Sequence, residues 1–115
     1  ARRAKVRAVA VAPNRQLFAS ASDDGKLTLF TRDMKPALTV PMGNIESLCF
    51  IGPTDFAIAI GTKEGTIKIV TVGTGRTIAF FEAGRASIRS LAASSDPVCL
   101  VWGAADGQVG QIGLP

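Results

Sequence analysis

Short runs of apolar residues, separated by turn-forming residues, follow one another along the whole chain. Within a run, apolar and polar positions alternate, as in Leu27-Thr28-Leu29 and Ile67-Lys68-Ile69. A period of two is expected for a β-strand that packs one face against a core. No segment keeps apolar residues at helical spacing, and glycine or proline interrupts the pattern at short intervals. The chain is therefore predicted to be all-β.

The apolar runs predict eleven strands. We expect them at residues 6–12, 17–22, 26–31, 37–40, 45–51, 56–60, 66–71, 77–81, 88–93, 98–102 and 108–112. The spacing apolar-x-x-apolar-x-apolar opens the first, fifth and ninth of these strands, starting at Val6, Ile45 and Ile88. This recurrence indicates that the chain is built from internal repeats.

An acidic residue followed by glycine lies between the second and third strands of each repeat. These pairs are Asp24-Gly25, Glu64-Gly65 and Asp106-Gly107, and their glycines are 40 and then 42 residues apart. Such a pair favours a tight hairpin, because glycine accepts the positive φ that the turn requires. A period of about 40 residues with several strands is typical of a β-propeller blade. We interpret the six residues as structural turns of propeller blades.

The repeats divide the chain into blades at about 5–42, 43–84 and 85–115, the third lacking its last strand. Closed propellers use typically about 4–8 blades, so three units do not form a ring. We expect a fragment of a larger ring, and the alternative is a ring completed by oligomerisation. In stacked blades, the strand at 56–60 should be buried on both faces, with small alanines letting the neighbouring blades approach.

The stretch from Ser20 to Phe30 resembles the central part of a WD40 repeat, with a serine-rich strand, an Asp turn and an alternating strand that ends in an aromatic residue. The resemblance covers almost three units and implies a WD40-repeat β-propeller, part of a seven-bladed ring. The repeats are degenerate, because the chain has no histidine for the family's Gly-His pair. Phe30-Thr31, Val70-Thr71 and Ile112-Gly113 replace its Trp-Asp pair. We therefore expect apolar packing, more than a buried polar network, to hold the blades together.

The charge of the chain is unevenly distributed. Lysine and arginine number 13 against 9 acidic residues, for a net charge of +4. Residues 1–35 contain eight of the basic side chains and three of the acidic ones. This basic third could meet a nucleic acid or an acidic protein, or it could be the solvated flank of edge strands.

Catalytic and metal-binding patterns are missing from the sequence. Without histidine, the commonest general base at neutral pH is lacking. Asp23 and Asp24 are adjacent, but a metal site needs several converging carboxylates. We expect no catalytic residues, no cofactor and no metal, and an enzymatic function would require residues from outside this segment.

Cysteine usage and hydropathy bear on location. Cys49 and Cys99 fall in apolar strand patterns and no CxxC motif is present, so we expect buried free thiols and a reducing, intracellular compartment, cytoplasmic or nuclear. The sequence contains no run of 18 apolar residues, the length that would predict a membrane-spanning helix.

With no catalytic or metal-binding pattern in the sequence, the remaining function class is recognition of a partner by the protein surface. Turns and blade connections should gather at one end of the ring and bring Asp23, Lys63 and Arg85 to a rim. Arg7, Glu46 and Arg89 follow the same apolar residue in each repeat, so we expect them at equivalent positions near the channel mouth. Their charges are interpreted either as partner contacts or as ordinary solvated side chains.

The sequence thus predicts a non-enzymatic scaffold that binds other proteins, together with the remaining blades of its ring, in an intracellular multi-subunit complex. The alternative is a nucleic-acid-associated propeller subunit that uses the basic N-terminal third.

Overall fold

The computed structural model describes residues 5–12, 16–51, 57–72, 74–95 and 98–113, and all regular structure within these ranges is β-strand. The strands are β1 Val6–Val11, β2 Leu17–Ser22, β3 Lys26–Thr31, β4 Pro36–Pro41, β5 Ile45–Ile51, β6 Ala57–Thr62, β7 Thr66–Thr71, β8 Thr77–Glu82, β9 Ile88–Ser95, β10 Val98–Ala104 and β11 Val109–Gly113. The all-β prediction is confirmed. Four strands have the predicted bounds and the others differ at their ends, while Phe56 lies outside the described residues.

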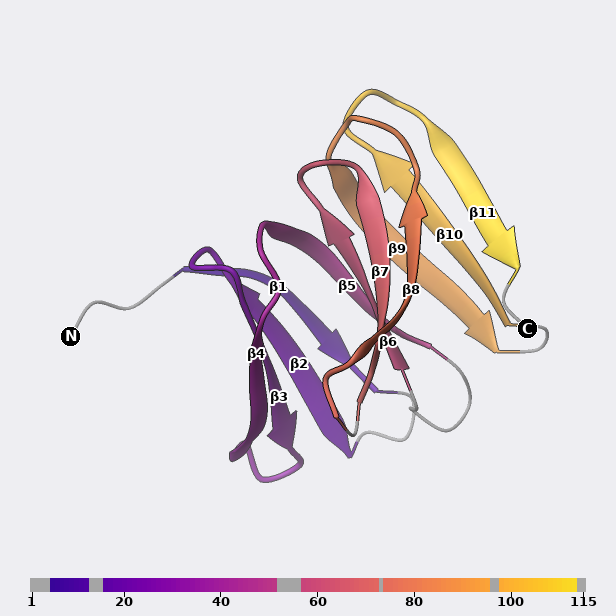
Figure 1. The fold of residues 1–115 in the computed structure, drawn as a ribbon. Helices are drawn as coiled ribbons and strands as arrows, with labels where there is room; N and C mark the ends of the chain where they lie inside the picture. The colour runs from indigo at the N-terminus through magenta and orange to yellow at the C-terminus, as the bar shows by residue number, and fades with distance from the viewer. Residues whose placement is uncertain (1–4, 13–15, 52–56, 73, 96–97, 114–115) are drawn as a thin grey trace.

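The strands form three antiparallel sheets of consecutive hairpins. Their orders are β1-β2-β3-β4, β5-β6-β7-β8 and β11-β10-β9, and we call them blades 1, 2 and 3. Figure 1 shows the blades side by side, fanning from the N-terminal to the C-terminal part of the chain. The first strands of the blades are neighbours in space, with β1 against β5 and β5 against β9. This radial arrangement is that of propeller blades, and the described blades do not close into a ring.

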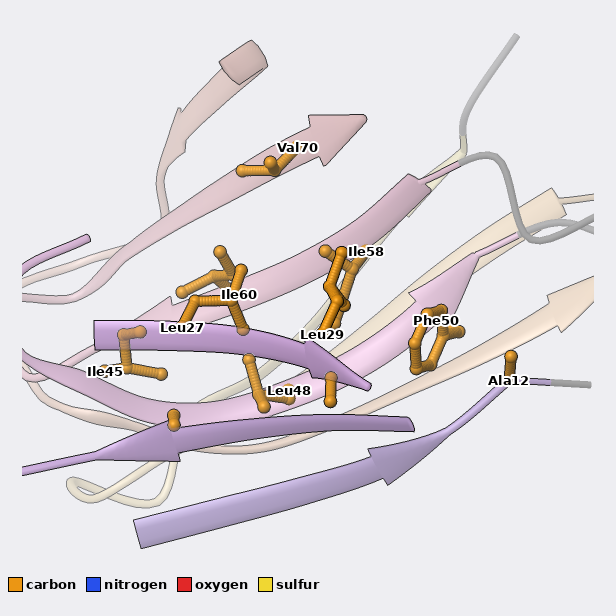
Figure 2. Packing of buried hydrophobic residues seen from close by; sticks show 11 residues of the cluster. Ala12, Leu27, Leu29, Ile45, Leu48, Phe50, Ile58, Ile60 and Val70 are labelled. Carbon is orange, nitrogen blue, oxygen red and sulfur yellow. The ribbon is translucent and has the colours of Figure 1, made fainter. Parts of the chain in front are cut away.

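The core lies between the blades. Between blades 1 and 2, one cluster joins small side chains of blade 1, such as Ala19 and Ala21, with larger ones of blade 2. Figure 2 shows Leu48, Phe50 and Ile58 of blade 2 in this cluster. Because an alanine occupies little space above the sheet, the neighbouring blade can approach closely and exclude water. A second cluster, including Ile67, Ile88 and Leu100, fills the space between blades 2 and 3.

Strand β6 is buried throughout, because it lies at the centre of blade 2 with a blade on each side. Every residue from Ala57 to Thr62 is buried. The expected burial of this strand on both faces is therefore confirmed over its described residues.

The two cysteines differ from their prediction. Both are free, as expected, but Cys49 and Cys99 are half-buried instead of buried. Neighbouring residues of a strand point to opposite faces of the sheet. Because Leu100 is fully buried, Cys99 points to the other face of blade 3, which no described blade covers. Cys49 lies on β5, the innermost strand of its blade, and partial burial raises the pKa of its thiol.

The outward faces of blades 1 and 3 expose positions that are buried elsewhere in the repeat. Val9 and Val11 are 71% and 57% exposed, whereas their equivalents in blade 2, Leu48 and Phe50, are buried. On blade 3, Val109 is 76% exposed, whereas its equivalent Ile67 is completely buried. Both end faces therefore have the apolar character of an inter-blade contact.

Candidate functional site

The acidic turns are built by glycine and by local hydrogen bonds. Gly25, Gly65 and Gly107 have φ values of +84°, +90° and +91°, a conformation that favours glycine. Asp24 Oδ1 accepts a hydrogen bond from the backbone N–H of Lys26 at 3.3 Å. In the third turn, Asp106 Oδ1 accepts one from Gln108 N–H at 3.1 Å.

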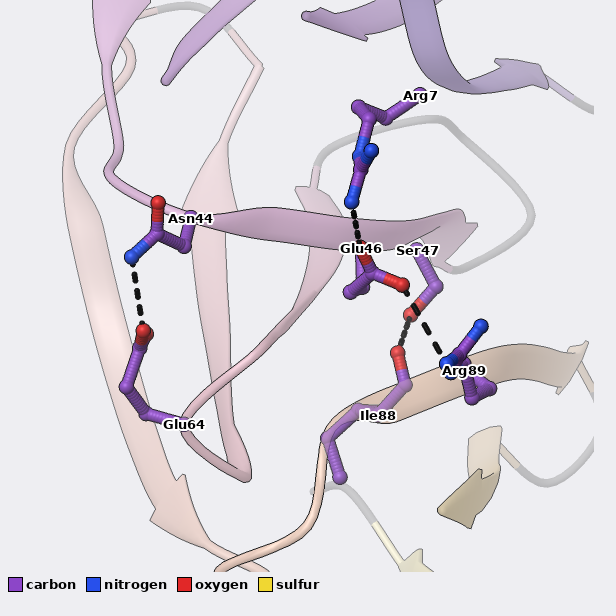
Figure 3. Close-up of polar contacts among 7 residues, drawn as sticks. All are labelled: Arg7, Asn44, Glu46, Ser47, Glu64, Ile88 and Arg89. Carbon is purple, nitrogen blue, oxygen red and sulfur yellow. Dashed lines mark hydrogen bonds and ion pairs between the residues drawn. The ribbon is translucent and has the colours of Figure 1, made fainter. Parts of the chain in front are cut away.

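Asp24 and Glu64 also have side-chain partners. The hydroxyl of Ser22 donates to Asp24, and this hydrogen bond is the main reason that the pKa of Asp24 lies below its usual range. Glu64 has a longer side chain and reaches the connection between β4 and β5, where its Oε2 accepts a hydrogen bond from Asn44 Nδ2 at 2.9 Å (Figure 3).

A repeated hydrogen bond ties each turn to the residue before the innermost strand. The backbone N–H of the first turn residue donates to a backbone carbonyl in all three blades: Asp23 to Lys5 at 2.8 Å, Lys63 to Asn44 at 2.9 Å and Ala105 to Ser87 at 2.9 Å. In blades 1 and 2, the connection to the next blade also donates to the carbonyl of the turn glycine, from Met42 and Ala83 at 2.7 and 3.0 Å. The turns and connections therefore form one hydrogen-bonded rim at this end of the blades.

Three of the predicted contact residues lie on this rim. Asp23 and Lys63 are exposed turn residues, and Arg85 is exposed in the connection between β8 and β9. The rim hydrogen bonds hold the backbone of Asp23 and Lys63 in place. The side chains of all three residues are accessible to solvent.

Arg7, Glu46 and Arg89 occupy the same β-bulge in each blade. Each lies between two residues of the innermost strand whose partners on the second strand are consecutive, so each is the extra residue in the pairing. A bulge bends the strand and changes the direction of a side chain. The equivalence of the three positions therefore has a backbone cause that recurs in every blade.

The three side chains form an ion-pair ladder across the blades, shown in Figure 3. Arg7 Nη2 lies 2.8 Å from Glu46 Oε1, and Arg89 Nε lies 3.8 Å from Glu46 Oε2. The Glu46 side chain is 11% exposed, whereas that of Arg89 is 66% exposed. Glu46 is therefore enclosed by its partners, and Arg89 presents most of its guanidinium to solvent.

Behind the ladder, blades 2 and 3 make a buried polar contact. The hydroxyl of Ser47 donates to the backbone carbonyl of Ile88 at 2.8 Å (Figure 3). A Cβ atom at Gly61 would lie 2.3 Å from Ser47 Oγ and 2.6 Å from Ile88 Cγ2, closer than atoms can pack. Glycine at this position therefore makes room for the approach of blade 3.

Sequence reasoning did not single out Ser47 and Gly61. A signal was present, because Ser90 and Gly103 recur at the equivalent places in blade 3 and pair with each other across β9 and β10. A Cβ atom at Gly103 would lie 3.0 Å from Ser90 Oγ. The recurrence of a serine on the inner strand opposite a glycine could have marked the close contact.

The described residues include neither a group of metal-binding side chains nor a membrane-spanning helix. Among those residues, no group of three or more His, Cys, Asp and Glu side chains could hold a metal ion. Within the same ranges, no helix is long and apolar enough to cross a membrane.

A radial stack of three- and four-stranded antiparallel sheets with a hydrogen-bonded rim of turns is the arrangement of β-propeller blades. The chain belongs to the WD40 family: residues 9–105 match the family described as the anaphase-promoting complex subunit 4 WD40 domain. No curated protein matches the chain in sequence. Membership of a WD40 family indicates a protein-interaction scaffold, the typical non-catalytic role of this class.

Proposed function

We propose that this chain is a non-enzymatic scaffold that binds other proteins through its rim within an intracellular multi-subunit complex. The observation that carries the proposal is the rim itself, in which a repeated hydrogen bond fixes the turns of all three blades. A rigid backbone that carries exposed charged side chains loses little conformational entropy when a partner binds. The matched family is named for a subunit of such a complex.

The partner-binding residues of the proposal fall into two groups. Asp23, Lys63 and Arg85 present exposed charges on the rim. Arg7 and Arg89 flank Glu46, which accepts a hydrogen bond from Arg7 and forms only a long ion pair with Arg89, so both guanidinium groups keep N–H donors for a partner. Arginine is enriched at the centres of protein interfaces, so Arg89, with its exposed side chain, is the preferred contact.

The proposal includes further blades on the outward faces of blades 1 and 3. Val9 and Val11 are exposed where the equivalent residues of blade 2 are buried. A ring of more blades would cover this apolar surface and the corresponding face around Val109, which favours a larger ring for the working form. The further blades come from the same polypeptide or from other copies, and the rim residues of the proposal are the same in both cases.

The alternative function rests on a different observation, the excess of basic residues in the first third of the chain. Of these residues, Lys5, Lys26, Arg32 and Lys35 are exposed. They could contact the phosphates of a nucleic acid, a mode of binding that weakens steeply as the salt concentration rises.

The test is affinity purification of the protein in its natural full length, comparing wild type with a rim variant, Lys63→Glu/Arg85→Glu/Arg89→Glu. Equal circular dichroism spectra and melting temperatures would establish that both are folded. We expect the rim variant to lose stoichiometric protein partners that wild type retains after nuclease treatment. An unchanged set of partners would contradict the proposal, and binding abolished by nuclease or by moderate salt would favour the alternative.

A further inference from the structure

Strand β8 forms the outer edge of blade 2 and carries large apolar side chains in solvent. It is the last strand of its sheet, and among the described strands it pairs with β7 alone. Ile78 and Phe80 are 52% and 53% exposed. A free edge of this kind presents unpaired backbone N–H and C=O groups, which makes it a template for another strand.

Blade 1 shows that the fold does not require these side chains. The bulges between the third and fourth strands align Ala37 with Ile78 and Thr39 with Phe80. Both blade 1 residues are exposed as well, but they are small or polar. The apolar pair on β8 is therefore a special feature of blade 2 and not of the repeat.

The ends of the two edge strands also differ. Strand β4 begins and ends with proline, at Pro36 and Pro41, which cannot donate a backbone hydrogen bond to an added strand. Strand β8 contains no proline. Both strands carry a bulge in their pairing with the third strand, and only β8 of the two combines a proline-free edge with exposed apolar side chains.

Read in the two directions from Ala79, the sequence around β8 places an apolar residue opposite an apolar residue and a basic residue opposite an acidic one. Arg76 precedes the strand, Glu82 ends it, and Ala79 lies midway between Ile78 and Phe80. Arg76 and Glu82 are exposed, and neither takes part in an ion pair with another described residue. The backbone of Arg76 is held beside β7, because its carbonyl accepts a hydrogen bond from Thr71 N–H at 2.9 Å.

We propose that β8 pairs with β8 of a second copy of this chain, antiparallel and centred on Ala79, to form a two-fold symmetric dimer. In this register Ile78 lies opposite Phe80 of the second copy, and Arg76 lies opposite Glu82. Ile78 and Phe80, directly opposite each other in this antiparallel pair, project to the same face, where apolar pairs stabilise the pairing, and the oppositely charged Arg76 and Glu82 lie at its two ends.

The proposed contact is closed and independent of further blades. Each copy uses its one β8 edge, so the pairing ends at two copies instead of propagating into a fibre. Because β8 lies on the outer edge of blade 2, the added blades of a larger ring would leave it free.

The experiment is size-exclusion chromatography with multi-angle light scattering on the natural full-length protein, over a range of concentrations. We expect a mass of two copies for wild type. Phe80→Lys and Arg76→Glu should each weaken dimerisation about tenfold or more, because one removes a central apolar contact and the other places like charges opposite each other twice. The double variant Arg76→Glu/Glu82→Arg should restore the dimer, since it reverses both charges of every pair.

The matched control is Thr39→Lys at the equivalent position of β4, which should leave the dimer unchanged. All substituted side chains are exposed, and circular dichroism would verify that each variant folds. A wild-type monomer at all concentrations would overturn the proposal. So would a dimer that survives both Phe80→Lys and Arg76→Glu, or a double charge reversal that fails to restore it.

Discussion

Glu46 receives two arginines from neighbouring blades, but its two ion pairs are unequal. The contact with Arg7 is short and joins two partly enclosed side chains, whereas the contact with Arg89 is at the outer limit for an ion pair and reaches solvent. Exposed pairs contribute little, because water and salt screen them and ordering long side chains costs entropy. The sequence showed three aligned charges, and the distances show which pair matters for stability.

Double-mutant cycles on alanine variants should therefore separate the two pairs. We expect a coupling free energy of about 1 kcal/mol between Arg7 and Glu46, and less than about 0.5 kcal/mol between Arg89 and Glu46. Urea unfolding of the single and double variants measures both values. Equal coupling for the two pairs would contradict the ladder geometry, and raising the salt concentration should reduce the weaker coupling further.

The glycines of the acidic turns offer a second residue-scale prediction, because they share positive φ but differ in how crowded the Cβ position is, with Gly65 the most crowded and Gly107 open. A Cβ atom at Gly65 would lie 2.3 Å from the Gly84 carbonyl oxygen, whereas one at Gly107 would have no neighbour within 4 Å. Gly107→Ala should cost about 1 kcal/mol from φ alone. Gly65→Ala should cost more than about 2 kcal/mol, since the Gly84 backbone must also move. Thermal denaturation compares the two, and a larger loss for Gly107→Ala would show the reasoning to be wrong.

At the scale of elements, the distance between blades is set by which strand positions carry small residues. Gly61 lies opposite Ser47 in the pairing of β5 with β6, and their approach lets the Ser47 hydroxyl reach the backbone of blade 3. The sequence predicted this closeness for the alanines at 57 and 59. It did not reveal the glycine, because a glycine in a strand by itself equally suits a bulge or a bend.

Gly61→Ala should therefore push blades 2 and 3 apart. We expect a loss of about 1–3 kcal/mol in the free energy of unfolding, the usual effect of overpacking. Gly84→Ala is the matched control, because its Cβ atom would meet only Gln108 Oε1 at 3.6 Å, and it should change stability by less than about 0.5 kcal/mol. Comparable losses for both variants would exclude close inter-blade packing as the cause.

At the scale of the whole molecule, the end faces decide how the segment behaves alone. Val9 and Val11 on blade 1 and Val109 on blade 3 expose apolar surface at positions that blade 2 buries. The free edge of β11 lies where β4 and β8 pair in the other blades. Both features favour association with whatever apolar sheet is available.

Expressed by itself, the 115-residue chain should therefore associate or aggregate. Light scattering is expected to give masses that rise with concentration, and Val9→Thr/Val11→Thr should reduce them while keeping β-branched side chains on the strand. A monodisperse monomer with a cooperative melting transition would show that three blades are sufficient, contrary to the proposed larger ring.

The sequence by itself determined the strands, the turns and the repeat, because alternation, glycine and acidic turn residues act over short stretches of chain. It also aligned Arg7, Glu46 and Arg89 by their common place after an apolar residue. Only the tertiary structure decided that these charges pair across blades, that Gly61 makes room for Ile88, and that β8 is an open apolar edge. Those properties depend on how residues from different blades, far apart in the chain, lie in space, which periodicity aligns but cannot measure.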